Sequence, residues 1–127
     1  MSEKLGFYRC EICGNIVQVL NSGAGELVCC GEEMKLLPIL HDTNELGEKH
    51  SPKIEEREGK RYVNVNAHPM NNEHYIQFIQ VVSEDKNELY TKFFFPEQKP
   101  EVDVTHFSEN LSAVEYCNIH HLWGMAE

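Results

Sequence analysis

Hydrophobic and polar positions alternate with a period of two in much of the chain after about residue 54. In "RYVNVNA", Val63 and Val65 alternate with Asn64 and Asn66, which is typical of a half-buried strand. The segments "HYIQFIQVV", "LYTKFFF", "EVDVTHF" and "SAVEY" follow, with breaks at the polar turn "SEDKNE" and at Pro96. Several short strands separated by turns predict an antiparallel β-sandwich, mainly β, with no long amphipathic helix.

The first 37 residues show a different pattern. They read as two short strands, "YRCEICGNIVQVL" and "ELVCCGEEMKLL", around the glycine-rich turn "NSGAG". A segment of this size buries too little apolar surface to fold unaided, so a structural staple is expected. Pro38 and "HDTNELGEKHSPK" read as linker and loop. The sequence therefore predicts two domains, residues 1–37 and 38–127.

Composition narrows the choice of partners and compartment. The chain has 127 residues, 41% of them hydrophobic, and a formal net charge of −10, which argues against nucleic-acid and anionic-membrane partners. It has no apolar run long enough to cross a bilayer, and the charged segment "MSEKLGFYRC" does not resemble a signal peptide. These features predict a cytoplasmic protein, in which five reduced cysteines are better explained as metal ligands than as disulfides.

Four of the cysteines form a first candidate metal site. Cys10 and Cys13 make a C-x2-C pair followed by glycine, and Cys29 and Cys30 are adjacent and also followed by glycine. A glycine after the pair can adopt a positive φ, which lets backbone N–H groups point at sulfur. Four thiolates favour tetrahedral zinc or iron, and the spacing alone leaves structural zinc and redox iron both open.

The fifth cysteine, Cys117, lies far from the others but three residues before His120. One interpretation joins Cys117, His120 and Met125 as a C-x2-H-x4-M loop, as in blue-copper electron carriers. The other gathers one thiolate and four imidazoles around a single iron with an open sixth position, from Cys117, His50, His68, His74 and His120. The copper interpretation leaves two histidines and the cysteine-rich segment without a role.

Taken together, "YRCEICGNIVQVL", "ELVCCGEEM", "EKH", "HPMNNEHYIQ" and "EYCNIH" resemble desulfoferrodoxin, the two-iron class of superoxide reductase, in the family's order. The resemblance implies a rubredoxin/desulforedoxin-like N-terminal metal domain, an immunoglobulin-like β-sandwich and a homodimer. It implies an FeS4 centre, in which zinc is also possible, on Cys10, Cys13, Cys29 and Cys30. It further implies an Fe(His)4Cys centre with Cys117 as axial thiolate and equatorial imidazoles from His50, His68, His74 and His120.

The implied activity is the one-electron reduction of superoxide to hydrogen peroxide at the second iron. Such an enzyme would serve oxidative stress defence in anaerobic or microaerophilic metabolism, with an electron donor such as rubredoxin. Glu48 and Lys49 match the family's Glu-Lys pair: Lys49 would attract the anionic substrate, and Glu48 would bind the oxidised iron. A metal-binding or electron-transfer module without superoxide chemistry would have the same ligands.

Three histidines fall outside the implied ligand set. His121 stands where the family usually has glycine, and the C-x2-H spacing favours its neighbour His120 as the ligand. His41 and His106 match no ligand position. We therefore expect all three to be bystanders.

Overall fold

The structure is a computed structural model that describes residues 2–41, 45–107 and 109–125. Contacts along the chain divide it into two compact units, Met1–Pro38 and Ile39–Glu127, so the division falls one residue after the expected boundary. Residues 42–44, part of the expected linker, lie outside the described residues.

The first unit contains five short strands where the sequence predicted two. They are β1 (Phe7–Arg9), β2 (Ile16–Gln18), β3 (Val28–Cys29), β4 (Glu32–Glu33) and β5 (Lys35–Leu36). The strands β2, β1 and β5 form one antiparallel sheet, and β3 pairs with β4 as a separate hairpin. The chain reverses at each cysteine pair, and these reversals keep the strands short. The buried apolar side chains are few: Phe7, Cys10, Val19, Met34 and Leu37.

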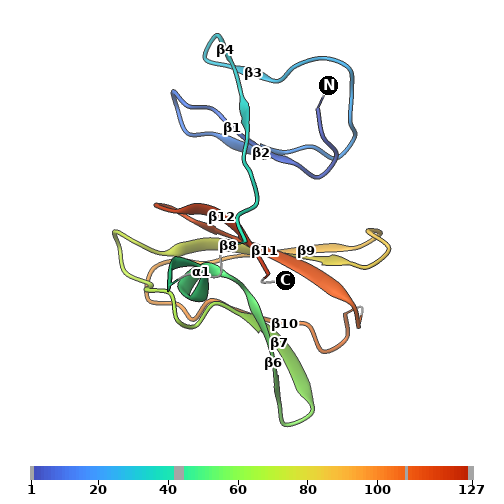
Figure 1. Ribbon diagram of the computed structural model, residues 1–127, viewed down its shortest axis with the longest axis vertical. Helices are drawn as coiled ribbons and strands as arrows, with labels where there is room; N and C mark the ends of the chain where they lie inside the picture. Colours follow the sequence, from blue (N-terminus) through green and yellow to red (C-terminus); the bar gives the residue numbers. More distant parts are fainter. Residues whose placement is uncertain (1, 42–44, 108, 126–127) are drawn as a thin grey trace. The chain divides into compact units, whose positions relative to one another are not determined.

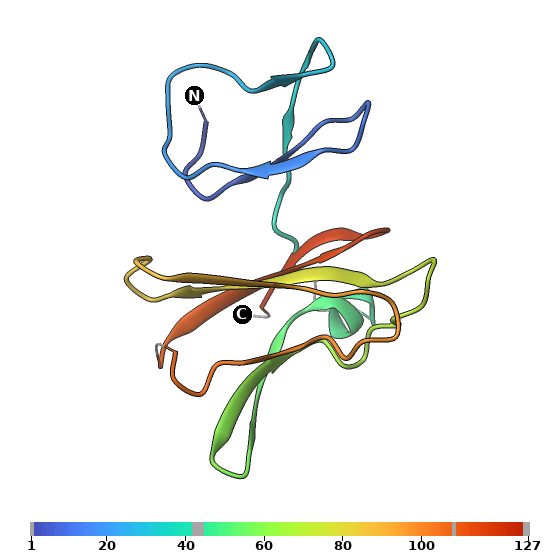
Figure 2. The same cartoon turned by 180° about the vertical axis from the view of Figure 1, so that it is seen from behind.

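The second unit is an antiparallel β-sandwich, as predicted. Its elements are α1 (Glu45–His50), β6 (Lys53–Arg57), β7 (Lys60–Asn64), β8 (Ile76–Ser83), β9 (Leu89–Phe93), β10 (Glu101–Asp103), β11 (Leu111–Cys117) and β12 (His121–Gly124). One sheet has the order β10-β7-β6 and the other the order β12-β11-β8-β9. Figures 1 and 2 show the two sheets as layers, with α1 at one side of them. No described helix is long and apolar enough to span a membrane.

The helix α1 corrects one prediction, because the segment "ELGEKH" was expected to be loop. Glutamate, leucine and lysine are good helix formers, and the N–H of Ser51 donates to the carbonyl of Gly47 (2.8 Å) to close the last turn. Pro52 then ends the helix, since proline has no N–H to continue the hydrogen-bonding pattern. The helix therefore ends at His50, whose side chain is buried.

The hydrophobic core lies between the two sheets. It contains Val63 of β7 and Val102 of β10 from one sheet, and Ile79 of β8 and Ala113 of β11 from the other. The pairing of β8 with β11 shifts register between Tyr116 and Cys117. Such a bulge redirects the side chains that follow it, and here it occurs at the cysteine of the second candidate site.

Candidate metal sites

The structure brings the four N-terminal cysteines into one cluster. The Sγ atoms of Cys10, Cys13, Cys29 and Cys30 all lie within 4.8 Å of one another, and those of Cys13 and Cys29 are 3.6 Å apart. At a metal–sulfur distance of about 2.3 Å, the sulfurs of a tetrahedral site lie roughly 3.8 Å apart. The separation of Cys13 and Cys29 is close to this value, so the cluster needs only small side-chain shifts to hold one tetrahedral metal ion.

The local backbone conformation lets N–H groups point at the sulfur atoms of this cluster. Gly14 and Gly31 have φ angles of 84° and 76°, as the sequence predicted, and Cys30 has a φ of 54°, which a residue with a Cβ adopts only under strain. The N–H of Cys13 donates to Cys10 Sγ (3.4 Å) and lowers the pKa of Cys10 to about 6. The pKa of Cys30 is raised by hydrogen bonds with the neighbouring thiols of Cys13, Cys29 and Cys10. Because each thiolate disfavours ionisation of the next, all four thiols lose their protons only when a cation binds among them.

The second cluster assembles from three separate segments of the sandwich unit. His50 ends α1, His68 and His74 lie in the loop between β7 and β8, and Cys117 ends β11 just before His120. The donor atoms of His50, His74, Cys117 and His120 lie within 4.8 Å of one another. His68 joins them, because its Nε2 is 3.2 Å from Cys117 Sγ.

A backbone carbonyl orients one of these imidazoles, and another has a buried nitrogen without a partner. The Nδ1 of His68 lies 2.6 Å from the carbonyl of Pro69, which leaves Nε2 toward Cys117. The ring of His68 lies 4.6 Å from that of His50 and 4.5 Å from that of His74, centroid to centroid. The buried Nε2 of His74 has no hydrogen-bond partner. A buried donor or acceptor without a partner is rare, and a metal ion would satisfy this one.

Burial shifts the pKa values of the histidines and the cysteine in this cluster. It lowers the pKa of His68 to about 4, with smaller contributions from the neighbouring imidazoles, so His68 is neutral at pH 7. It also lowers the pKa of His74. Burial raises the pKa of Cys117, opposed by the N–H groups of His120 and Ile119, which point at its sulfur. Neutral imidazoles are the form that binds metals, and a bound cation would displace the thiol proton.

Several positioning residues were not predicted from the sequence. The side chain of Asn118 accepts from the N–H of Tyr75 (2.9 Å) and donates to the carbonyl of Glu73 (3.0 Å). It thereby ties the loop that carries His74 to the turn that carries His120. Asn71 Oδ1 accepts from the N–H of His74 (2.9 Å). Asparagines beside metal ligands, in "HPMNNEH" and "YCNIH", are the signal that could have found them.

Trp123 and Glu115 were also missed. The indole of Trp123 stacks on His50, with centroids 4.9 Å apart, and its Nε1–H donates to the carbonyl of His120 (2.9 Å). Glu115 is fully buried two residues before Cys117, with no partner for either carboxyl oxygen. Burial raises the pKa of Glu115 to about 9. Alternation along a strand gives no sign that a glutamate faces inward.

The structure also places the remaining candidates. Glu48 and Lys49 are exposed on α1, and the charge of Lys49 contributes, after burial and His120, to the lowered pKa of His74. His41 and His121 are outside the cluster: His41 Nδ1 lies 3.0 Å from the carbonyl of Met125, and His121 stacks on Tyr116. His121 has a φ of 69°, a conformation that glycine adopts without strain.

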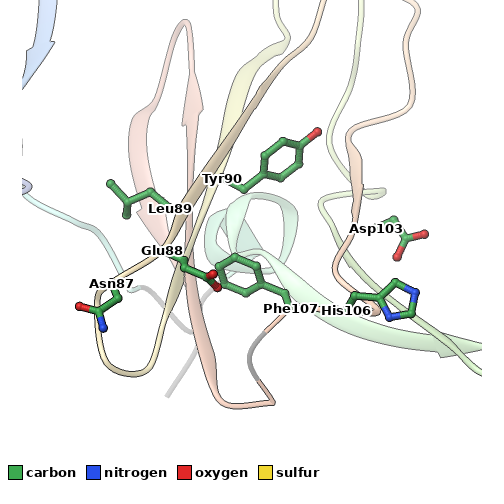
Figure 3. Close-up of a pocket in the computed structure, with 7 residues that line it drawn as sticks. All are labelled: Asn87, Glu88, Leu89, Tyr90, Asp103, His106 and Phe107. Carbon is green, nitrogen blue, oxygen red and sulfur yellow. The ribbon is translucent and has the colours of Figure 1, made fainter.

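His106 belongs to a different part of the sandwich. It lies beside Asp103 at an open hollow of about 720 Å³, which Tyr90 and Phe107 also line (Figure 3). The turn between β8 and β9 borders this hollow, whereas the metal cluster lies at the start of β8. The eight residues of β8 span roughly 26 Å, so the hollow and the cluster lie at opposite ends of the strand.

The fold and the two donor clusters define a β-sandwich metalloprotein with a separate four-cysteine unit. Family models described as "Desulfoferrodoxin, N-terminal domain" and "Desulfoferrodoxin" match residues 2–37 and 42–126. The chain is 47% identical to the desulfoferrodoxin of Desulfarculus baarsii over 125 residues, 97% of each chain. This chain belongs to the desulfoferrodoxin family, as the sequence motifs predicted, and its two clusters match the two iron centres of that family.

Solved structures of superoxide reductases are similar to the chain. The superoxide reductase of Treponema pallidum shares the fold, with a TM-score of 0.67 and 24% identity over 98% of both chains. The superoxide reductase of Nanoarchaeum equitans has a TM-score of 0.53 and 28% identity, over 69% of this chain and 96% of its own.

Proposed function

We propose that the chain is a superoxide reductase, which converts superoxide, one electron and two protons into hydrogen peroxide. The observation that carries this proposal is the convergence of four imidazoles and one thiolate beside an exposed lysine. Membership of the desulfoferrodoxin family and the similarity to the Nanoarchaeum equitans enzyme support it.

We assign the ligands as the sequence predicted. The first metal, iron or zinc, is held by Cys10, Cys13, Cys29 and Cys30. The second, iron, would be held by the thiolate of Cys117 and by the imidazoles of His50, His68, His74 and His120. Neutral nitrogen donors with a single thiolate suit a redox-active first-row metal, and these five ligands would leave room for a small anion to bind.

Ferrous iron at this site would supply the electron that superoxide accepts. The chain's own residues do the rest. Lys49 offers a positive charge beside the cluster in a protein whose net charge is −10, and so attracts an anion that the whole molecule repels. Trp123 covers one face of His50 and holds the turn at His120 in place. The N–H of His120 donates to Cys117 Sγ (3.4 Å) and favours the thiolate. Glu48 is the carboxylate we assign to the oxidised iron.

The blue-copper interpretation is not favoured. It uses Cys117, His120 and Met125 with one further histidine, and leaves the other imidazoles of the cluster unexplained. Family membership also argues for iron at both sites.

We further propose a cytoplasmic homodimer that receives electrons from a protein such as rubredoxin. Large apolar side chains that are mostly exposed support a subunit interface, among them Leu20 (70%), Val28 (63%) and Phe95 (70%). Light scattering on the purified protein would show a mass of twice 14.7 kDa if this is right.

The proposed activity can be tested by adding a known dose of superoxide to the reduced, iron-loaded protein. We expect one hydrogen peroxide per superoxide, no dioxygen, and oxidation of the second iron. One dioxygen per peroxide would instead identify a dismutase, and no reaction would leave an electron carrier or a structural metalloprotein.

We expect Lys49→Ala to slow superoxide capture about tenfold, with a weaker dependence on salt, because the local cation that attracts the substrate is lost. Pulse radiolysis at two ionic strengths measures the second-order rate constant. Lys60→Ala is the matched control, since Lys60 is an exposed lysine at the start of β7. An unchanged rate constant in Lys49→Ala would remove Lys49 from the mechanism.

We expect Cys13→Ser to leave the reaction of the pre-reduced second iron with superoxide unchanged, because every proposed ligand of that iron lies in the sandwich unit. Turnover fed by reduced rubredoxin then shows what the first centre does. Intact turnover would show that the first centre is structural. Slow turnover, with a normal reaction of the pre-reduced second iron with superoxide, would show that the first centre transfers electrons to the second.

A further inference from the structure

A small cavity lies beside the proposed iron site, where the end of α1 meets β6 and the end of β7. Its volume is about 240 Å³, and its lining includes Lys49, Ser51, Lys53, Asn64 and Asn66. Pockets for drug-sized ligands are larger than this, so the cavity suits a small ion with its hydration water.

Ser51 gives this cavity a buried donor. The residue is only 3% exposed, and its Oγ has no hydrogen-bond partner. Buried hydroxyl groups in folded proteins nearly always have a partner. An acceptor atom inside the cavity that Ser51 lines would provide one.

The charges around the cavity favour an anion. Lys49 and Lys53 are both exposed, and neither forms an ion pair within the described part of the chain. Glu48 also lines the cavity and is the opposing charge. The nearby carboxylate of Glu55 is already engaged, because it accepts from Asn64 Nδ2 (2.8 Å) and pairs with Arg57 (3.2 Å). Two ammonium groups against one carboxylate leave a local positive charge.

We propose that this cavity binds a small inorganic oxoanion of the phosphate or sulfate class. The hydroxyl of Ser51 donates a hydrogen bond to an anion oxygen, and Lys49 and Lys53 supply the compensating charge. Lys49 is then shared between this anion and the incoming superoxide, so the bound oxoanion slows superoxide capture. That second statement rests on the proposed function, whereas binding itself does not.

Inorganic phosphate is the probe, added to the metal-loaded protein at constant ionic strength set with chloride. Calorimetry on the zinc-loaded protein measures binding without any redox chemistry. We expect one saturable site, with affinity about tenfold lower in Ser51→Ala and in Lys53→Gln, which corresponds to the loss of one charge-assisted or buried hydrogen bond. Lys60→Gln removes a lysine from the same sheet at the far end of the β6–β7 hairpin and should bind as the wild type does.

In the ferrous protein, the phosphorus resonance of phosphate should broaden through proximity to the paramagnetic iron, and it should stay sharp in the zinc protein. No saturable binding, or equal binding by the wild type, Ser51→Ala and Lys53→Gln, would overturn the proposal.

Superoxide capture with and without phosphate tests the coupling. Phosphate should slow capture in the wild type and in Lys60→Gln, and slow it much less in Lys53→Gln. Equal slowing in all three overturns the shared role of Lys49. If the protein binds phosphate but does not react with superoxide, the anion site stands and the proposed function is wrong. If it reacts with superoxide but does not bind phosphate, the proposed function stands and the anion site is wrong.

Discussion

Replacement of Cys117 by Ser is expected to reduce superoxide turnover by at least about a hundredfold and to abolish the visible sulfur-to-iron absorption band of the second centre in the oxidised protein. Loss of residues that only support a metal ligand costs about 10- to 100-fold in affinity or activity, and loss of the ligand itself should cost at least as much. Cys117 is completely buried, and its Sγ lies 3.2 Å from His68 Nε2. Serine has nearly the same shape, so the fold should persist while the soft thiolate is lost.

The measurement combines absorption spectra of the ferricyanide-oxidised protein with the superoxide rate constant and the iron content. Cys13→Ser is the matched control, because it makes the same chemical change at the first cluster and should leave the second absorption band intact. A Cys117→Ser protein that keeps both its iron and the band would show that another residue supplies the sulfur ligand.

Glu115→Gln is expected to stabilise the protein at neutral and alkaline pH by roughly 3 kcal/mol at pH 7. Burial raises the pKa of Glu115 from 4.5 to about 9, so the folded state holds a proton that the unfolded state releases. The stability that Glu115 contributes is therefore full below pH 4.5 and is lost as the pH rises toward 9. Glutamine has the same shape and does not titrate, so the advantage of the variant should grow with pH.

Chemical unfolding of the zinc-loaded wild type and Glu115→Gln, at several pH values from 5.5 to 8.5, measures this difference. Comparing two proteins with the same metal cancels the pH dependence of metal binding. Glu88→Gln, the same change at an exposed carboxylate, is the matched control. A pH-independent difference for Glu115→Gln would show that the Glu115 carboxyl is ionised and partnered in the folded protein.

The sandwich was predictable because its strands carry their burial pattern in period two, as Val63 and Val65 do in β7. The helix α1 was not, because six residues are too few to show a 3.6-residue period, and its stability depends on packing rather than propensity. The five short strands of the first unit were not predicted individually for a similar reason. Strands of two or three residues have no measurable alternation, and the cysteine cluster rather than the hydrophobic pattern determines their course.

At the sites, the donor residues that the structure brings together were visible in the sequence, whereas those that position them were not. A cysteine three residues before a histidine is compatible with a shared metal, because both side chains can reach one ion. Asn118 and Trp123 act through backbone groups of distant segments, and these partners become known only when the chain is folded. The buried state of Glu115 depends on the layer that covers it, which no local pattern encodes.

His121 shows how a residue with a Cβ is accommodated in the left-handed region. At its φ of 69°, histidine adopts at a cost a conformation that glycine adopts freely. Its ring is parallel to that of Tyr116, with an interplanar angle of 1° and centroids 6.0 Å apart. This contact offsets part of the cost and keeps the imidazole away from the metal cluster.

The stacking of Trp123 on His50 has a practical consequence for spectroscopy. Trp123 is the only tryptophan in the chain, and it is buried against a proposed ligand of the second metal. Its fluorescence is therefore an intrinsic optical reporter for that site. Iron or copper bound to His50 should quench the emission, while zinc should leave it bright. Loading and loss of the second metal can then be followed in real time, without a label and at concentrations too low for absorption spectra.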